Sequence, residues 1–141
     1  MTEKEAPPPE VAAAFDALPP DIAYVLRAVR LDIAHAARAT AGVGQLIETL
    51  KWGEPAYLTE APKIGTTLRL GRIGGQAAVM VPCSTTIIED ARTIFGNVPE
   101  LSGKRGLILG GDAQMLAHVI HAALTYHMRK RRSSFERLSG P

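Results

Sequence analysis

The 141-residue sequence is poor in cysteine and in aromatic residues. Its single cysteine, Cys83, excludes a disulfide within the chain and is typical of a protein kept in a reducing compartment. Aromatic residues make up only 5% of the chain, whereas hydrophobic residues in total make up 46%. We therefore expect one domain whose core is built mainly from alanine, valine, isoleucine and leucine.

Long apolar runs are also missing. No run approaches the roughly 20 apolar residues of a membrane-spanning helix, and the opening MTEKEAPPPE lacks the apolar stretch of a secretory signal. We therefore expect a cytoplasmic protein without a membrane partner. The net charge of +2 is well short of the dense basic surface of nucleic-acid-binding proteins, so a nucleic-acid partner is not expected.

No catalytic motif occurs in the chain. The Gly42-Val43-Gly44 stretch is too short for a dinucleotide-binding fingerprint, and Gly103-Lys104 lacks the upstream glycine of a phosphate-binding loop. There is no GxSxG nucleophile elbow, and Cys83 has no partner at metal-ligand spacing. We therefore expect a protein that is not an enzyme, and its residues predict no cofactor.

Proline content and hydrophobic periodicity divide the chain into three parts. Residues 1–9 are polar and end in three prolines, which predicts a disordered lead-in. Residues 10–132 carry the periodic segments and form a single domain. Residues 133–141 show no periodicity and are predicted to form a flexible tail.

Helical periodicity is strongest between residues 21 and 39. Apolar residues there recur every three or four positions and form one stripe: Ile22, Leu26, Val29, Ile33 and Ala37. Three arginines are predicted to lie outside that stripe: Arg27, Arg30 and Arg38. Similar reasoning predicts further helices over residues 10–18, 84–96 and 113–132.

Residues at the predicted helix ends have the expected capping chemistry. Asp21 and Asp112 are predicted N-caps, and Ser84 or Thr85 is the candidate cap of the helix over 84–96. Gly96 is a natural C-terminal stop for that helix.

Alternating apolar and polar residues predict strands over 46–52, 56–60, 66–73 and 76–83, followed by a short strand over 104–110. Gly74-Gly75 is a tight-turn signal between two of them. The order of elements predicts an α+β fold, in which an antiparallel meander packs against N-terminal, middle and C-terminal helices. Helices are expected mainly on one face of the sheet.

The chain's only tryptophan, Trp52, and Tyr57 flank a Gly-Glu-Pro turn. Two interpretations remain open: the pair seals the core, or it forms the wall of a ligand pocket in which Glu54 accepts hydrogen bonds. Cys83 and Thr86 are the candidate neighbours of that pocket. A cis Pro55 would hold the two rings close together across the turn.

Cys83 itself has two interpretations. A thiol at the start of a helix has a lowered pKa and can act as a nucleophile, whereas most free cysteines are small buried apolar residues. We favour burial.

His118 and His121 are separated by three positions on the last predicted helix. That spacing could hold one edge of a metal ion, but two ligands do not complete a site, and histidines at a helix flank explain the spacing equally well. Carboxylates that could serve the same purpose are Glu54, Glu60, Glu89 and Asp90.

Four stretches resemble a known family: LPPDIAYVLRAVRLDI, ETLKWGEPAYLT, VPCSTTIIEDARTIF and ALTYH. In matching order over about residues 18–130, they resemble the YdhG-like domain of unknown function. The resemblance implies a small α+β domain distantly like the frataxin group. Some relatives are described as intracellular iron chaperones, so the resemblance alone implies iron. However, Asp21 and Asp32 lie among arginines, and no acidic ridge can be drawn on their helix.

These observations predict a small cytoplasmic binding or adaptor domain for an unknown small ligand or protein. The alternative is a frataxin-like iron or metal chaperone. An exposed sheet face or edge strand could also pair two copies into a homodimer.

Overall fold

The structure is a computed structural model and describes residues 1–128, so the basic cluster 129–132 and the predicted tail 133–141 lie outside the described residues. The α+β prediction is confirmed. The elements are α1 (Pro9–Asp16), α2 (Pro20–Ala39), β1 (Leu46–Lys51), β2 (Glu54–Thr59), β3 (Leu68–Ile73), β4 (Gln76–Met80), α3 (Ile87–Phe95), β5 (Leu101–Ser102), β6 (Gly106–Ile108) and α4 (Ala113–Leu124).

All neighbouring strands are antiparallel, in the order β1-β2-β3-β4-β6-β5. The predicted meander of the first four strands is confirmed. Strand β5 was not predicted, because two residues are too few to show an alternating pattern. It pairs Leu101 with Leu107 and Ser102 with Gly106 at the edge of the sheet.

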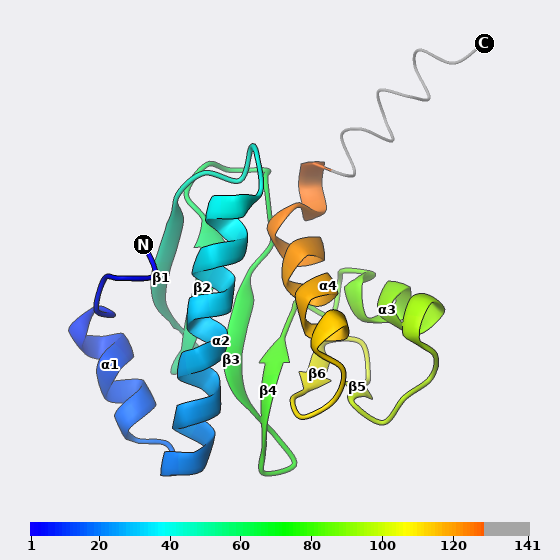
Figure 1. Ribbon diagram of the computed structural model, residues 1–141, viewed down its shortest axis with the longest axis horizontal. Helices are drawn as coiled ribbons and strands as arrows, with labels where there is room; N and C mark the ends of the chain where they lie inside the picture. Colours follow the sequence, from blue (N-terminus) through cyan, green and yellow to red (C-terminus); the bar gives the residue numbers. More distant parts are fainter. Residues whose placement is uncertain (129–141) are drawn as a thin grey trace.

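The helices lie on one face of the sheet. Figure 1 shows α2 and α4 side by side in front of the strands, with α1 beyond α2 and α3 beyond α4. The core lies between these two layers. Its sheet side includes Tyr57, Leu68, Leu70, Val79 and Leu107.

Helix α2 buries the predicted stripe but differs from the prediction in two residues. Arg30 is only 5% exposed, so its expected place outside the stripe is wrong. It lies four positions after Leu26 and therefore shares the buried side of the helix. Asp21 is not the N-cap, because the helix begins at Pro20, whose fixed φ suits the first turn, and Pro19 occupies the cap position.

Of the other predicted helix caps, Asp112 and Gly96 are confirmed, and Ser84 or Thr85 is wrong. Asp112 caps α4 by accepting a 2.8 Å hydrogen bond from the Gln114 backbone N–H, and Gly96 ends α3 with φ of 90°. Ser84 and Thr85 do not cap α3. The N-cap is Thr86, whose side chain makes no capping hydrogen bond to the helix backbone, and the Thr85 hydroxyl donates to the Pro82 carbonyl.

The first eight residues lie against β1 and α2. The amino group of Met1 donates to the Leu46 carbonyl at 3.4 Å, and the Glu3 carboxylate lies 3.2 Å from Arg38 and 3.3 Å from His35. The sequence predicted a disordered lead-in over 1–9. In the structure this segment makes the contacts above, and α1 begins at Pro9.

Helix α4 ends at Leu124, where a loop meets it, whereas the helix was predicted to run from 113 to 132; residues 126–128 are again helical, and 129–132 lie outside the described residues. Thr125 is its C-cap, and the Thr66 N–H donates to the Ala123 carbonyl at 2.8 Å. A Cβ on Gly65 would lie 2.7 Å from the Leu124 carbonyl oxygen, so only glycine allows this close approach.

Candidate functional site

The predicted aromatic pocket does not form around Trp52 and Tyr57. Trp52 and Gly53 make a two-residue hairpin turn with φ of 56° and 75°, and Trp52 is 90% exposed. Tyr57 is fully buried in the core. The cis prediction for Pro55 is wrong, because residues 1–128 contain no cis peptide bond.

Tyr57 belongs to a buried polar network that joins α2 to β1 and β2. Its hydroxyl donates to Glu48 Oε2 at 2.8 Å, and Arg30 donates to the same carboxylate from Nε at 2.5 Å and from Nη2 at 2.8 Å. The side chains of Arg30 and Glu48 are 6% and 4% exposed. Arg30 Nη2 also donates to the Glu5 carbonyl at 3.1 Å, which ties in the N-terminal segment.

The network favours one protonation state. Burial raises the pKa of Tyr57 above its ordinary range, and the hydrogen bond to Glu48 raises it further. The hydrogen bond to Glu48 likewise raises the pKa of Arg30. Both carboxylate oxygens of Glu48 are used by donors from the protein itself. The network therefore holds the layers together and leaves little room for a ligand.

Glu54 is turned to the sheet face that carries no helix. Its Oε1 accepts a 2.7 Å hydrogen bond from Arg69 Nη1. Its carboxylate lies over Gly71, where a Cβ would overlap it, and the methyl group of Met80 lies over the same glycine. Ile73 covers Gly106 in the same way. The central small residues of this face are thus covered by the sheet's own side chains.

Cys83 and Thr86 both lie in the segment between β4 and α3. Cys83 is exposed, so the favoured burial interpretation is wrong. Thr86 is engaged by Asp90, 3.0 Å from its hydroxyl, and by the Tyr126 hydroxyl at its backbone N–H. The cavity beside Cys83, about 370 Å³, is lined by Ile73, Ser102, Gly103, Lys104 and Arg105 and by none of the other predicted pocket residues.

The two histidines do not converge. His118 packs edge-on against Phe95 with ring centroids 5.7 Å apart, whereas His121 is exposed. Within residues 1–128, no group of three or more histidine, cysteine, aspartate or glutamate side chains is placed to hold a metal ion. The described residues therefore contain no metal centre that would support the metal-chaperone alternative.

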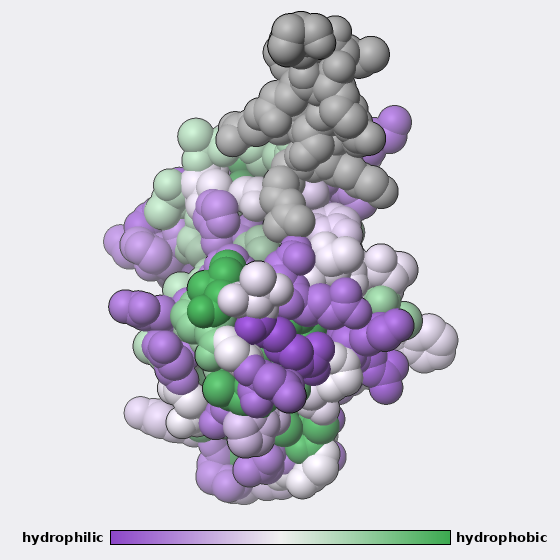
Figure 2. Space-filling view, turned by 90° about the vertical axis from the view of Figure 1, so that its right-hand side faces the viewer, coloured by the Kyte–Doolittle hydropathy of each residue, from purple (hydrophilic) through white to green (hydrophobic). Residues whose placement is uncertain are grey.

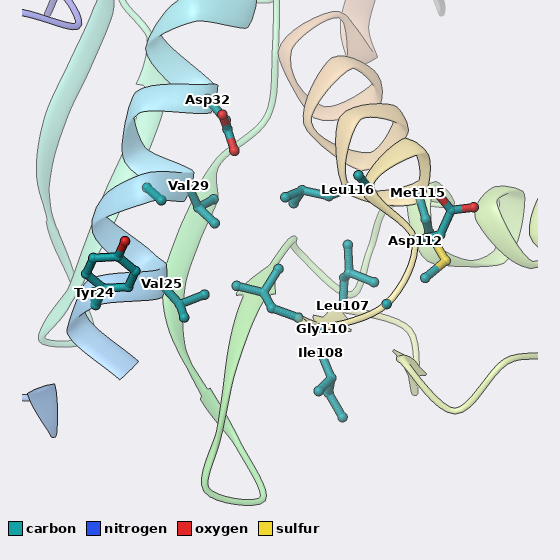
Figure 3. Close-up of a pocket in the computed structure, with 14 residues that line it drawn as sticks. Tyr24, Val25, Val29, Asp32, Leu107, Ile108, Gly110, Asp112, Met115 and Leu116 are labelled. Carbon is teal, nitrogen blue, oxygen red and sulfur yellow. The ribbon is translucent and has the colours of Figure 1, made fainter. Parts of the chain in front are cut away.

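An apolar groove runs between α2 and α4. Figure 3 shows Val25 and Val29 on α2 facing Leu116 on α4, with Leu107 of β6 below them. The cavity there has a volume of about 310 Å³. It is closed at one end by the turn through Gly110 that leads into α4.

A second cavity of about 310 Å³ continues the groove along the same two helices. The cavities share Asp32, Ala113 and Leu116. Together they extend along α2 from Tyr24 to Ala36, about 18 Å of helix. We call this combined feature the α2–α4 groove.

Small side chains explain why the groove is open. Ala28 and Ala36 on α2 and Ala113 and Ala117 on α4 line it, and a methyl group is too short to fill the space between two helices. The surface on the α3 side of the molecule carries only small hydrophobic areas, which hydrophilic residues interrupt (Figure 2).

Asp32 is the acidic side chain that points into the groove (Figure 3). Partial burial raises its pKa above the ordinary value for aspartate, while nearby His35 acts in the opposite direction. Asp112 also borders the groove, but its carboxylate points away and caps α4. No lysine or arginine lines either cavity among the described residues.

Sequence reasoning missed this groove, although α2 carried a signal for it. Val25 is an apolar residue outside the predicted core stripe, it lines the groove, and it is 39% exposed. An apolar surplus beyond one helix face indicates a second contact surface. The contribution of α4 carried no comparable signal, because alanines are common on any helix.

Among residues 1–128, no helix has the length and apolar character required to span a membrane. Comparison of the chain with protein-family models, with curated proteins and with solved structures gave no match.

Proposed function

We propose that this chain is a non-catalytic binding domain whose ligand occupies the α2–α4 groove. The observation that carries the proposal is the continuous apolar trough, two cavities long, into which Asp32 projects the one carboxylate among the described residues. Apolar walls supply affinity, and one polar group fixes orientation, which is the usual composition of a small-molecule site.

The proposal moves the site away from the residues that sequence reasoning favoured. Tyr57 and Glu54 already have partners within the chain, and Trp52 stands alone on an exposed turn. Asp32, by contrast, lines both cavities and has neither a hydrogen bond nor an ion pair among residues 1–128.

The other predicted roles gain less support. The resemblance to the YdhG-like domain remains a prediction, and a metal chaperone lacks a ligand set in the described residues. A homodimer through the helix-free sheet face is disfavoured, because side chains such as Arg69 and Met80 already cover its centre. A cytoplasmic location agrees with the exposed, unpaired Cys83.

The test is a ligand screen by two-dimensional NMR on the native protein and on Ala28→Arg. Ala28 is exposed and lines the groove, and an arginine there would fill the groove and reach Asp32 one turn on. We expect ligands whose shift changes cluster on α2 and α4 and whose binding Ala28→Arg abolishes.

Ala13→Arg is the matched control, because Ala13 is an exposed alanine on α1. It should leave binding unchanged. A screen whose ligands all map elsewhere, or bind Ala28→Arg as well as the native protein, would refute the proposal.

A further inference from the structure

We propose that the α2–α4 groove selects ligands with a narrow aliphatic body and a positively charged nitrogen, such as an alkylammonium. This inference rests on the proposed function and adds the chemical class of the ligand.

The side chains that line the α2–α4 groove determine the shape of the apolar part of the ligand. The side chains that face one another across the groove are aliphatic: Val25, Val29, Leu107 and Leu116 (Figure 3). The one aromatic residue at the groove, Tyr24, lies on the side of α2 away from α4. A chain-like body can therefore contact both helices along the trough, whereas among the described residues no phenylalanine, tyrosine or tryptophan ring lies between α2 and α4 to stack on a flat ligand.

The position of Asp32 determines the charge that we expect on the ligand. It lies where the two cavities meet, so a group bound to it has apolar space on either side. Among residues 1–128, Asp32 has neither a hydrogen bond nor an ion pair, and His35 is the one titratable neighbour that acts on its charge. A cation carried by the ligand would supply the partner that the fold does not.

Ligands of other charge fit less well. A carboxylate would meet Asp32 as a like charge and find no lysine or arginine in the lining of the cavities. A neutral alcohol keeps the apolar contacts but gains no ion pair. A basic helix from a partner protein is the competing occupant, and it would also cover the exposed Tyr24 and Leu31.

The experiment compares octylammonium, 1-octanol and octanoate, which share one alkyl chain, by NMR titration of the full chain at pH 7.5 and low salt. We expect shift changes at Val25, Asp32 and Leu116, and affinities in the order ammonium, alcohol, carboxylate. Because Asp32 is partly exposed, the ammonium should bind about two- to five-fold more tightly than the alcohol. Added salt should reduce that ratio.

Three variants locate the effect. Asp32→Asn should bring the ammonium to the affinity of the alcohol without changing alcohol binding. Ala28→Arg should abolish binding of all three probes, and Ala13→Arg on α1 should change nothing.

The outcomes separate the two proposals. Equal affinities of octylammonium and octanol in the groove would overturn the charge preference and leave the proposed function standing. If none of the three probes binds while the screen yields groove ligands of another kind, the ligand class is wrong. If the screen also fails, both proposals fall. Unchanged binding of the probes to Ala28→Arg would overturn their placement inside the α2–α4 groove.

Discussion

A carboxylate lies on each of the two sides of α2, one fully paired within the protein and one without a hydrogen-bond or ion-pair partner among the described residues. On the inner side, Glu48 is buried and accepts three hydrogen bonds from Arg30 and Tyr57. On the side facing α4, Asp32 projects into a groove without such a partner among the described residues. A buried charge is tolerated only when it is fully paired, whereas a partly exposed one can stay unpaired at small cost.

This difference separates a structural role from a functional one. Where the fold supplies every partner, the carboxylate joins elements and has no capacity left for a ligand. Where the fold leaves a carboxylate unpaired in an apolar groove, a ligand can complete its contacts.

Glu48→Ala should have the largest effect. It leaves the guanidinium of Arg30 buried without its counter-ion, and breaking a buried pair in this way costs about 3–5 kcal/mol. Urea unfolding followed by circular dichroism measures the loss. A cost below about 1 kcal/mol would show that the network does not hold the layers together.

Tyr57→Phe should have an intermediate effect. It removes one hydrogen bond to a charged acceptor and keeps the ring in the core, which costs about 1.5–3 kcal/mol. The native protein should also lose stability at high pH. The folded-state pKa of Tyr57 is raised above the unfolded value of about 10, so this contribution is complete below that pH and is lost as pH rises through the folded-state value.

The pH dependence has an internal control, because Tyr57→Phe cannot ionise at this position. Its unfolding free energy should fall less steeply above about pH 10 than that of the native protein. If the unfolding free energies of the two proteins fell equally steeply with pH, the assignment of this pH dependence to the Tyr57 hydroxyl would be wrong.

Glu54→Ala should have a small effect. Its ion pair with Arg69 lies on the helix-free face, with side chains 28% and 21% exposed, and such pairs contribute about 0–1 kcal/mol. The variant is a matched comparison for Glu48→Ala, because both remove a glutamate paired to an arginine next to the same hairpin. Equal costs for the two would show that burial does not decide the weight of the pair.

Asp32→Asn should have the smallest effect on stability at neutral pH, and its direction should be neutral to favourable. The raised pKa of Asp32 means that the folded state holds the proton more tightly than the unfolded chain. That contribution is present at low pH and is lost as pH rises through the folded-state pKa. The free energy of unfolding of the native protein minus that of Asp32→Asn should therefore be lower at pH 7 than at pH 3.

Local patterns predicted much of the fold. The stripe from Ile22 to Ala37, the alternating strands, the Asp112 cap and the Gly96 stop each depend on neighbours within a few residues. They could therefore be inferred from periodicity and capping chemistry.

The site depended on contacts between distant parts of the chain. Helix periodicity places Arg30 on the buried side of α2, but it does not report Glu48, the partner on β1 that allows a charged side chain to be buried there. The groove exists because α4 lies beside α2 with alanines at the contact. The aromatic pair misled for the opposite reason, since a two-residue turn placed Trp52 and Tyr57 in different environments.

The most direct test of the central claim is the NMR titration of the native protein with octylammonium, followed residue by residue. The account predicts saturable shift changes on both α2 and α4, centred on Asp32 and Leu116. Shift changes centred on the Trp52 turn or around Cys83, with α2 and α4 unaffected, would contradict it.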